Sequence, residues 1–169
     1  MSKLGFFILL LAFSIPSWAE EKARYVEPPY QPPKVVYEFY LDDPAKMSSA
    51  LYWVRALINP LTESPYDMAP DFMDIKLVIH GSEIVTLVKK NYLRYHDIVE
   101  RIRYYAALGV EIKVCSLAAE EFSYDVSDFF EFVELVPSAF TELVHWQQQG
   151  YALITPQVFL RTRSIDEIR

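Results

Sequence analysis

A short apolar run, residues 74–80 with the sequence DIKLVIH, limits the folds open to this chain more than any other feature. Ile75, Leu77, Val78 and Ile79 make it apolar on both faces of a strand. Such a strand is typical of the interior of a parallel sheet that is covered by helices. A glycine and a serine follow at once, so the strand leads directly into the start of a helix. We therefore expect an α/β fold with helices on both sides of the sheet.

The rest of residues 34–156 alternates between strand patterns and helix patterns. Further strands are expected at residues 34–41, 110–115, 132–136 and 151–155, and helices at 44–58, 83–90, 91–108, 116–121 and 139–149. Gly109 and Gly150 stand just past two of these helices, where glycine commonly ends a helix. The alternation predicts a three-layer α/β/α domain with a mostly parallel sheet of about five strands. The order of the strands does not follow from it.

Capping residues and prolines mark where several of these helices begin and end. Asp43, Ser116 and Ser138 are each suited to cap a helix N-terminus, and Pro44 suits the first helical position. Pro60 is expected to stop the first helix just before it. Residues 61–72 then form an irregular connection.

The first nineteen residues have the features of a secretory signal peptide. Lys3 precedes an apolar run from Leu4 to Ile15, and small residues stand where a signal peptidase cleaves. Cleavage is predicted between Ala19 and Glu20. The run is shorter than the roughly 20 residues that a membrane span needs, although an uncleaved anchor is the alternative. We therefore expect an exported protein, periplasmic in a bacterium, with no membrane span after cleavage.

Two segments flank the expected domain at 34–156. Residues 20–33 are polar and rich in proline, which favours an extended N-terminal arm. Residues 157–169 are of mixed composition and are expected to form a C-terminal tail at the surface.

Composition excludes several classes of function. The formal net charge is −7, and removal of Lys3 with the signal peptide makes it −8, which argues against binding to nucleic acid. A single cysteine excludes an intramolecular disulfide and any metal site built from several cysteines. The histidines, His80, His96 and His145, show no metal-ligand spacing. We expect neither a metal nor a cofactor.

Cys115 is the strongest candidate for a reactive group. It ends the strand at 110–115, and Ser116 begins the next helix, where backbone N–H groups favour an anion. That setting favours the thiolate, which is the reactive form of cysteine. His80 and Gly81 also fall at the carboxyl end of a strand, where ligands bind in parallel sheets. The alternative is that Cys115 packs as a small hydrophobic residue, as free cysteines commonly do.

Four motifs between residues 76 and 152 form a recognisable set. They are KLVIHG at 76–81, LGVEIKVC at 108–115, VPS at 136–138 and QQQGYA at 147–152. Together they resemble the DsrE/DsrF-like family over residues 74–156. The resemblance implies an α/β fold with a parallel sheet, commonly assembled into trimers or hexamers. It also implies sulfur relay, because the best-understood members are cytoplasmic proteins that carry persulfide sulfur on a cysteine after the third strand, a position that falls on Cys115.

The chain departs from the family pattern in two places. Ala139 stands where many members have glycine after the proline–serine pair, and the predicted signal peptide would separate the chain from cytoplasmic relay partners.

Three functions stay open at this stage. The favoured one is a periplasmic persulfide carrier that uses Cys115, with His80, Gly81 and Ser116 as binding residues. Such a protein would exchange sulfur with a thiol or sulfane-sulfur donor or acceptor protein, and it is a carrier rather than a turnover enzyme. The alternatives are a non-catalytic oligomeric binding protein and a structural subunit. In each case we expect a homo-oligomer.

Overall fold

A five-stranded sheet forms the centre of the protein. The structure, a computed structural model, describes residues 22–159 and 161–169. The strands are β1 (Lys34–Phe39), β2 (Asp74–Ile79), β3 (Glu111–Cys115), β4 (Val133–Val136) and β5 (Ala152–Ile154). Their order is β4-β3-β2-β1-β5, and every neighbouring pair is parallel. The apolar strand β2 lies in the middle, as its sequence predicts.

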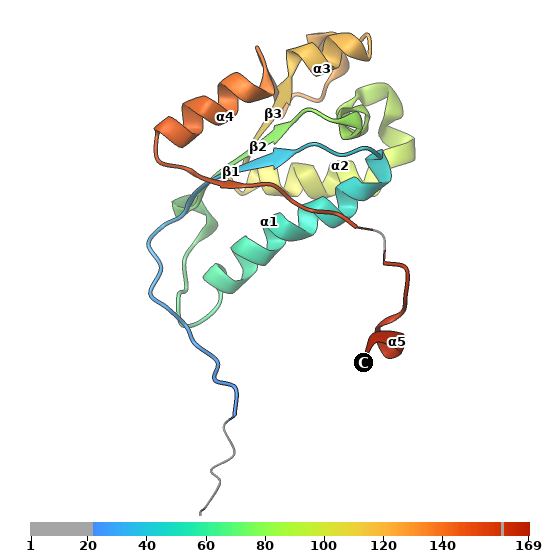
Figure 1. The fold of residues 1–169 in the computed structure, drawn as a ribbon. Helices are drawn as coiled ribbons and strands as arrows, with labels where there is room; N and C mark the ends of the chain where they lie inside the picture. The colour runs from blue at the N-terminus through green and yellow to red at the C-terminus, as the bar shows by residue number, and fades with distance from the viewer. Residues whose placement is uncertain (1–21, 160) are drawn as a thin grey trace, which may run out of the picture.

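Helices cover both faces of this sheet (Figure 1). The helices α1 (Met47–Thr62) and α2 (Tyr92–Ala107) lie on one side, and α4 (Ala139–Gln148) lies on the other with α3 (Ser116–Glu121) at its edge. Gly109 and Gly150 follow α2 and α4 with φ of 92° and 84°, the left-handed conformation expected of residues that end helices. This arrangement confirms the three-layer α/β/α fold.

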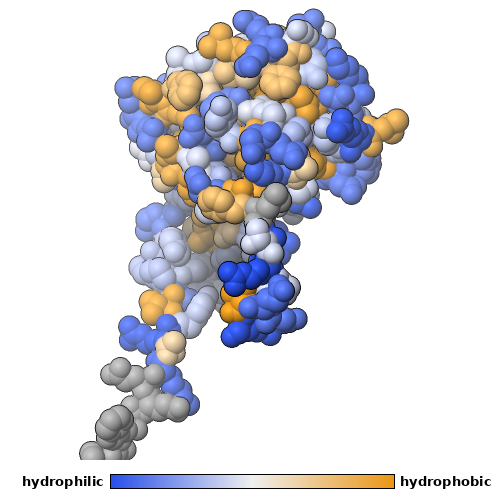
Figure 2. Space-filling model, turned by 45° about the vertical axis from the view of Figure 1, so that its right-hand side comes forward, coloured by the Kyte–Doolittle hydropathy of each residue, from blue (hydrophilic) through white to orange (hydrophobic). Residues whose placement is uncertain are grey.

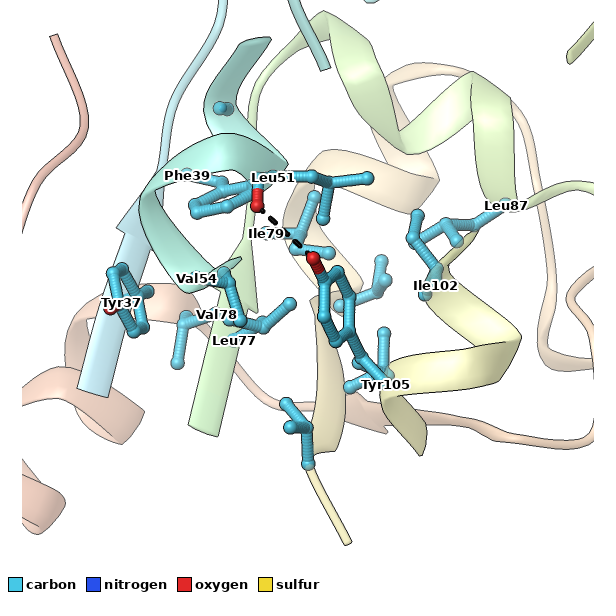
Figure 3. Packing of buried hydrophobic residues seen from close by; sticks show 14 of the residues in the cluster. Tyr37, Phe39, Leu51, Val54, Leu77, Val78, Ile79, Leu87, Ile102 and Tyr105 are labelled. Atoms are coloured by element: carbon cyan, nitrogen blue, oxygen red, sulfur yellow. Dashed lines mark hydrogen bonds between the residues drawn. The ribbon is translucent and has the colours of Figure 1, made fainter. Parts of the chain in front are cut away.

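The hydrophobic core lies between the sheet and the pair α1 and α2. Tyr37, Leu77 and Ile79 of the strands are fully buried here with Ile102 of α2 (Figure 3). The Tyr105 hydroxyl donates to the Leu51 carbonyl at 3.5 Å, which gives the buried phenol a hydrogen-bond partner. Because successive side chains of a strand point to opposite faces of the sheet, these strand residues face α1 and α2. The strand residues between them point toward α4.

The face of the sheet turned toward α4 is polar near the start of the strands. Lys76 and Lys113 are buried there, and Lys113 forms ion pairs with Glu111 at 3.0 Å and Glu134 at 2.7 Å. Lys76 also pairs with Glu111, and its ammonium lies 4.6 Å from the centre of the Trp146 ring. Burial alone would lower the pKa of each lysine, but Asp74 and Glu111 beside Lys76, and Glu134 and Glu111 beside Lys113, raise both pKa values above their ordinary range. This network holds β2, β3 and β4 together beneath α4.

Two predictions about the helices were wrong. Pro60 does not stop α1, which continues to Thr62 because the following Leu61 is buried against the core and holds the last turn in place. The expected helix at 83–90 is instead a pair of 3-10 helices, Ser82–Leu87 and Lys89–Asn91. The residue between them, Val88, is extended and bridges to Phe129, which prevents a continuous α-helix.

Ser138 caps α4 as predicted, and its removal should weaken the fold. Its Oγ accepts a hydrogen bond from the Thr141 N–H at 3.1 Å. We expect Ser138→Ala to lower the free energy of unfolding by about 1 kcal/mol, measured by urea denaturation. Ser164 is a matched control because it caps α5 (Ile165–Ile168), which stands apart from the domain in Figure 1. Ser164→Ala should leave the main transition unchanged, and equal effects of the two substitutions would contradict this account.

The segment before β1 is extended and mostly exposed. It touches the domain at Tyr66, whose hydroxyl donates to the Pro28 carbonyl at 2.8 Å and whose ring meets Tyr30 edge-on. The predicted signal peptide and its cleavage site between Ala19 and Glu20 lie outside the described residues. Within residues 22–159 and 161–169, no helix combines the length and apolar character that crossing a membrane requires.

Candidate functional site

The candidate site lies at the carboxyl edge of the sheet. Cys115 is the last residue of β3, and the pairing of Ile79 with Val114 places His80 and Cys115 at the next neighbouring positions on β2 and β3. Paired positions in a parallel sheet point to the same face, so both side chains lie on the side of α4. The structure therefore brings together two residues that the sequence placed at strand ends.

Cys115 is a buried thiol at the junction between β3 and α3. It is 6% exposed and belongs to the hydrophobic core. Cys115 itself occupies the cap position of α3, with φ −65° and ψ 120°, and its side chain makes no capping hydrogen bond. Ser116 is the first helical residue, so the prediction that Ser116 caps this helix was wrong. Because α3 has only six residues, its dipole is small.

His80 is held by a short chain of polar contacts. Its Nε2 lies 3.2 Å from Glu38 Oε1, and the other oxygen of Glu38 accepts a hydrogen bond from the Thr155 hydroxyl at 3.0 Å. The imidazole stacks on the Tyr40 ring at 4.8 Å and meets the Phe140 ring edge-on. Burial lowers the pKa of His80 below its ordinary value, and Glu38 opposes that change. His80 is therefore neutral at neutral pH.

Removal of the Glu38 carboxylate should change the titration of His80. In Glu38→Gln we expect the pKa of His80 to fall further, because the charge that favours imidazolium is lost. Histidine ring signals followed by NMR against pH would measure this. Asp97→Asn is a suitable control because Asp97 lies beside His96 and is exposed. A His80 signal that titrates identically in Glu38→Gln and the unchanged chain would contradict the assigned contact.

Gly81 belongs to a tight junction between the ends of β1 and β2. The N–H groups of Gly81 and Leu41 donate to the two carboxylate oxygens of Glu83 at 3.0 and 2.9 Å. The Ser82 N–H and hydroxyl both donate to the Leu41 carbonyl. Glu83 is fully buried, and burial raises the pKa of its carboxyl to about 7 although these N–H donors oppose the change.

A hollow of about 330 Å³ opens beside this junction. Its lining includes Tyr40, Asp42, His80, Gly81, Glu121 and Phe122. Two of the predicted site residues, His80 and Gly81, thus face the hollow, whereas Cys115 and Ser116 are not part of its lining. The thiol lies beneath the surface at the same edge of the sheet, in a position that needs an opening before a partner can reach it.

Sequence reasoning missed Glu38 and Glu83 as parts of this site. Each had a signal, because each is an acidic residue within a mostly apolar segment: Glu38 in the strand at 34–41, and Glu83 just after a strand end. Among the described residues, no group of three or more His, Cys, Asp or Glu side chains is arranged to hold a metal ion.

These features define a parallel α/β protein with a cysteine at the end of its third strand. The model of the DsrE/DsrF-like family matches residues 38–156, and the chain belongs to this family. No curated protein matches the sequence. Among solved structures, MTH1491, a protein of unknown function from Methanobacterium thermoautotrophicum, is similar with 22% sequence identity and a TM-score of 0.58. The match covers 73% of this chain and 99% of that one, and it shows a shared fold.

Proposed function

We propose that this protein is a periplasmic sulfur carrier that holds persulfide sulfur on Cys115. Membership of the DsrE/DsrF-like family supports a sulfur-relay-like role. The observation that carries the proposal is the position of Cys115, the single cysteine of the chain, at the carboxyl end of β3 and next to His80. Ligand sites of parallel sheets lie at this edge.

The proposed step is an exchange between thiols. The Cys115 thiolate attacks the terminal sulfur of a donor persulfide, R–S–SH, which forms a new S–S bond and releases the donor as R–S⁻. The product is Cys115–S–SH. An acceptor thiolate then attacks the outer sulfur, takes it as a new persulfide and restores the Cys115 thiolate. Sulfur, protons and electrons balance without a metal or an external oxidant.

Burial of the thiol sets a condition on this reaction. Because Cys115 is 6% exposed, a donor reaches it only when the structure around the ends of β3 and α3 opens. Small sulfane-sulfur donors should therefore load the protein faster than bulky ones. The same burial would protect the persulfide from reduction by small thiols in solution after the donor has left and before the acceptor binds.

The predicted signal peptide supports the choice of compartment. Residues 1–19 have the features of a secretory signal peptide, and loss of Lys3 with it would change the formal net charge from −7 to −8. The donor and acceptor would then be exported thiol proteins. We further propose that the protein assembles as a homo-oligomer, a trimer or a hexamer, which light scattering on the mature form would test.

The second candidate function is a non-catalytic oligomeric binding or structural protein. The placement of the hollow favours it, because the hollow is lined by His80 and Gly81 but not by Cys115. In that case Cys115 contributes only to packing.

Intact-mass analysis after incubation with a small sulfane-sulfur donor separates the two candidates. The carrier should gain one sulfur atom, and Cys115→Ser should gain none while keeping its urea unfolding transition. Because the chain has a single cysteine, no second thiol can account for the added mass. If the unchanged protein stays unmodified while Cys115→Ala mainly lowers stability, the thiol is a packing residue and the carrier proposal fails.

A further inference from the structure

A groove crosses the carboxyl edge of the sheet and has no role in the sulfur chemistry. The hollow beside His80 adjoins a second hollow of about 310 Å³, and the two share Tyr40, Leu41 and Asp42 in their walls. One end of the groove is formed by Phe122 at the end of α3, and the other end by Phe159 in the segment after β5.

The groove is suited to a cation. The carboxylates of Glu38, Asp42 and Glu121 lie in its walls. Among the described residues that line it, the one lysine or arginine is Lys46, which is already bound to Asp42 at 2.7 Å. A positively charged side chain of a partner would therefore meet an excess of negative charge.

Tyr40 gives the groove an aromatic surface. One face of its ring stacks on His80, and the residue is nonetheless 72% exposed, so the ring presents area to the groove. Phe159 adds a second exposed ring, at 81%. An aromatic face beside carboxylates is the environment that a guanidinium group prefers, because it can stack and form paired hydrogen bonds at once.

The tail supplies such groups in a segment with exposed apolar side chains. Residues 161–169 leave the α/β body and carry Arg161 and Arg163 before α5 (Figure 1). In Figure 2 this segment projects below the body. Ile165 and Ile168 of α5 are 52% and 64% exposed. A helix this short is not stable alone in water, and its exposed isoleucines offer apolar area to a partner.

We propose that the groove binds the arginine side chains at 161–163 of a second copy of this chain. The guanidinium of Arg163 lies on the open face of Tyr40, within reach of Glu121 and Asp42. The tail follows the region that matches the family model, which ends at residue 156, so the arginine side of the contact lies outside the family domain. The groove and the tail are different surfaces of one chain. If two copies each place their tail in the other's groove, they form a closed dimer; if each copy places its tail in the groove of the next copy, they form a ring.

Zero-length coupling between isotopically distinct chains tests the proposal. Arg163→Lys keeps the positive charge and supplies an amine that a carbodiimide joins to a touching carboxylate. Full mature chains carrying this substitution, one preparation in ¹⁴N and the other in ¹⁵N, are unfolded together in urea, refolded as a mixture so that both isotopes enter the same assemblies, coupled and digested. We expect peptides that join the introduced amine at position 163 of one isotope to Glu121 or Asp42 of the other. The Lys46–Asp42 pair within each chain is an internal positive control.

Matched variants make the result decisive. Glu121→Gln should abolish the coupling at that position, whereas Glu120→Gln, one residue earlier and also exposed, should leave it intact. Coupling of position 163 only within chains of one isotope, or to carboxylates elsewhere, would overturn the proposal. A groove that binds N-acetyl-arginine amide in the absence of any coupling from position 163 would also overturn it, since the occupant would then be a small cation. None of these outcomes depends on whether Cys115 carries sulfur.

Discussion

Gly81→Ala is expected to lower the free energy of unfolding by about 3 kcal/mol. A Cβ on residue 81 would lie 2.4 Å from the Leu41 nitrogen, 2.6 Å from the Leu41 oxygen and 2.4 Å from Glu83 Oε2. Two of these atoms are backbone atoms fixed by hydrogen bonds, so they cannot move aside without breaking the junction between β1 and β2. The expected loss of stability comes from steric overlap and not from backbone strain, because φ at Gly81 is −98°, which any residue can adopt.

Urea denaturation of Gly81→Ala and Gly109→Ala together would measure this effect. Gly109 has φ of 92° and nothing within 4 Å of an added Cβ, so its substitution carries only the cost of a left-handed conformation, about 1 kcal/mol. A larger loss at Gly81 than at Gly109 supports the tight junction. A Gly81→Ala protein as stable as the unchanged chain would show that the two strand ends are not held this closely.

The buried carboxyl of Glu83 should make stability fall as the pH rises toward neutrality. Its pKa is raised from 4.5 to about 7 in the folded protein, so between these values the folded state binds more protons than the unfolded state. The contribution is therefore full below pH 4.5 and is lost as the pH passes 7. Over that interval it amounts to on the order of 3 kcal/mol. His80 acts in the opposite direction, because its pKa is lowered and the unfolded state binds its proton more readily.

Glu83→Gln isolates this contribution from that of His80. The unchanged protein should lose on the order of 2–3 kcal/mol more than Glu83→Gln when the free energy of unfolding is measured at pH 5 and again at pH 8. Glu120→Gln, at an exposed position, should retain the full pH dependence. Equal pH dependence in all three proteins would refute the role of Glu83.

Much of the fold follows from local sequence signals. The apolar run at 74–80, the glycines after α2 and α4, and Ser138 before α4 each act over a few residues, and the structure has the elements they predict. Two of the errors arose where distant contacts decide the outcome. Burial of Leu61 lets α1 continue past Pro60, and the bridge from Val88 to Phe129 interrupts the helix expected at 83–90. The order of the strands likewise depends on contacts across the sheet.

The site was predictable only in part for the same reason. Strand ends place Cys115, His80 and Gly81 at one edge, and that much is encoded locally. The partners of those residues come from other strands and loops: Glu38 reaches His80 from β1, and Glu83 binds Leu41 across 42 positions of sequence. Burial of the thiol also depends on packing that no local pattern reports.

The persulfide on Cys115 in exported protein is the most direct test of the proposed carrier. The protein would be isolated from the periplasmic fraction of cells that produce the full chain, with a thiol-blocking reagent present throughout to trap persulfides. Mass spectrometry would then read the N-terminus and the state of Cys115. The account predicts an N-terminus at Glu20 and a fraction of Cys115 trapped with one extra sulfur, lost in Cys115→Ser. Protein found only in the cytoplasm, or Cys115 present only as an unmodified thiol, would contradict it.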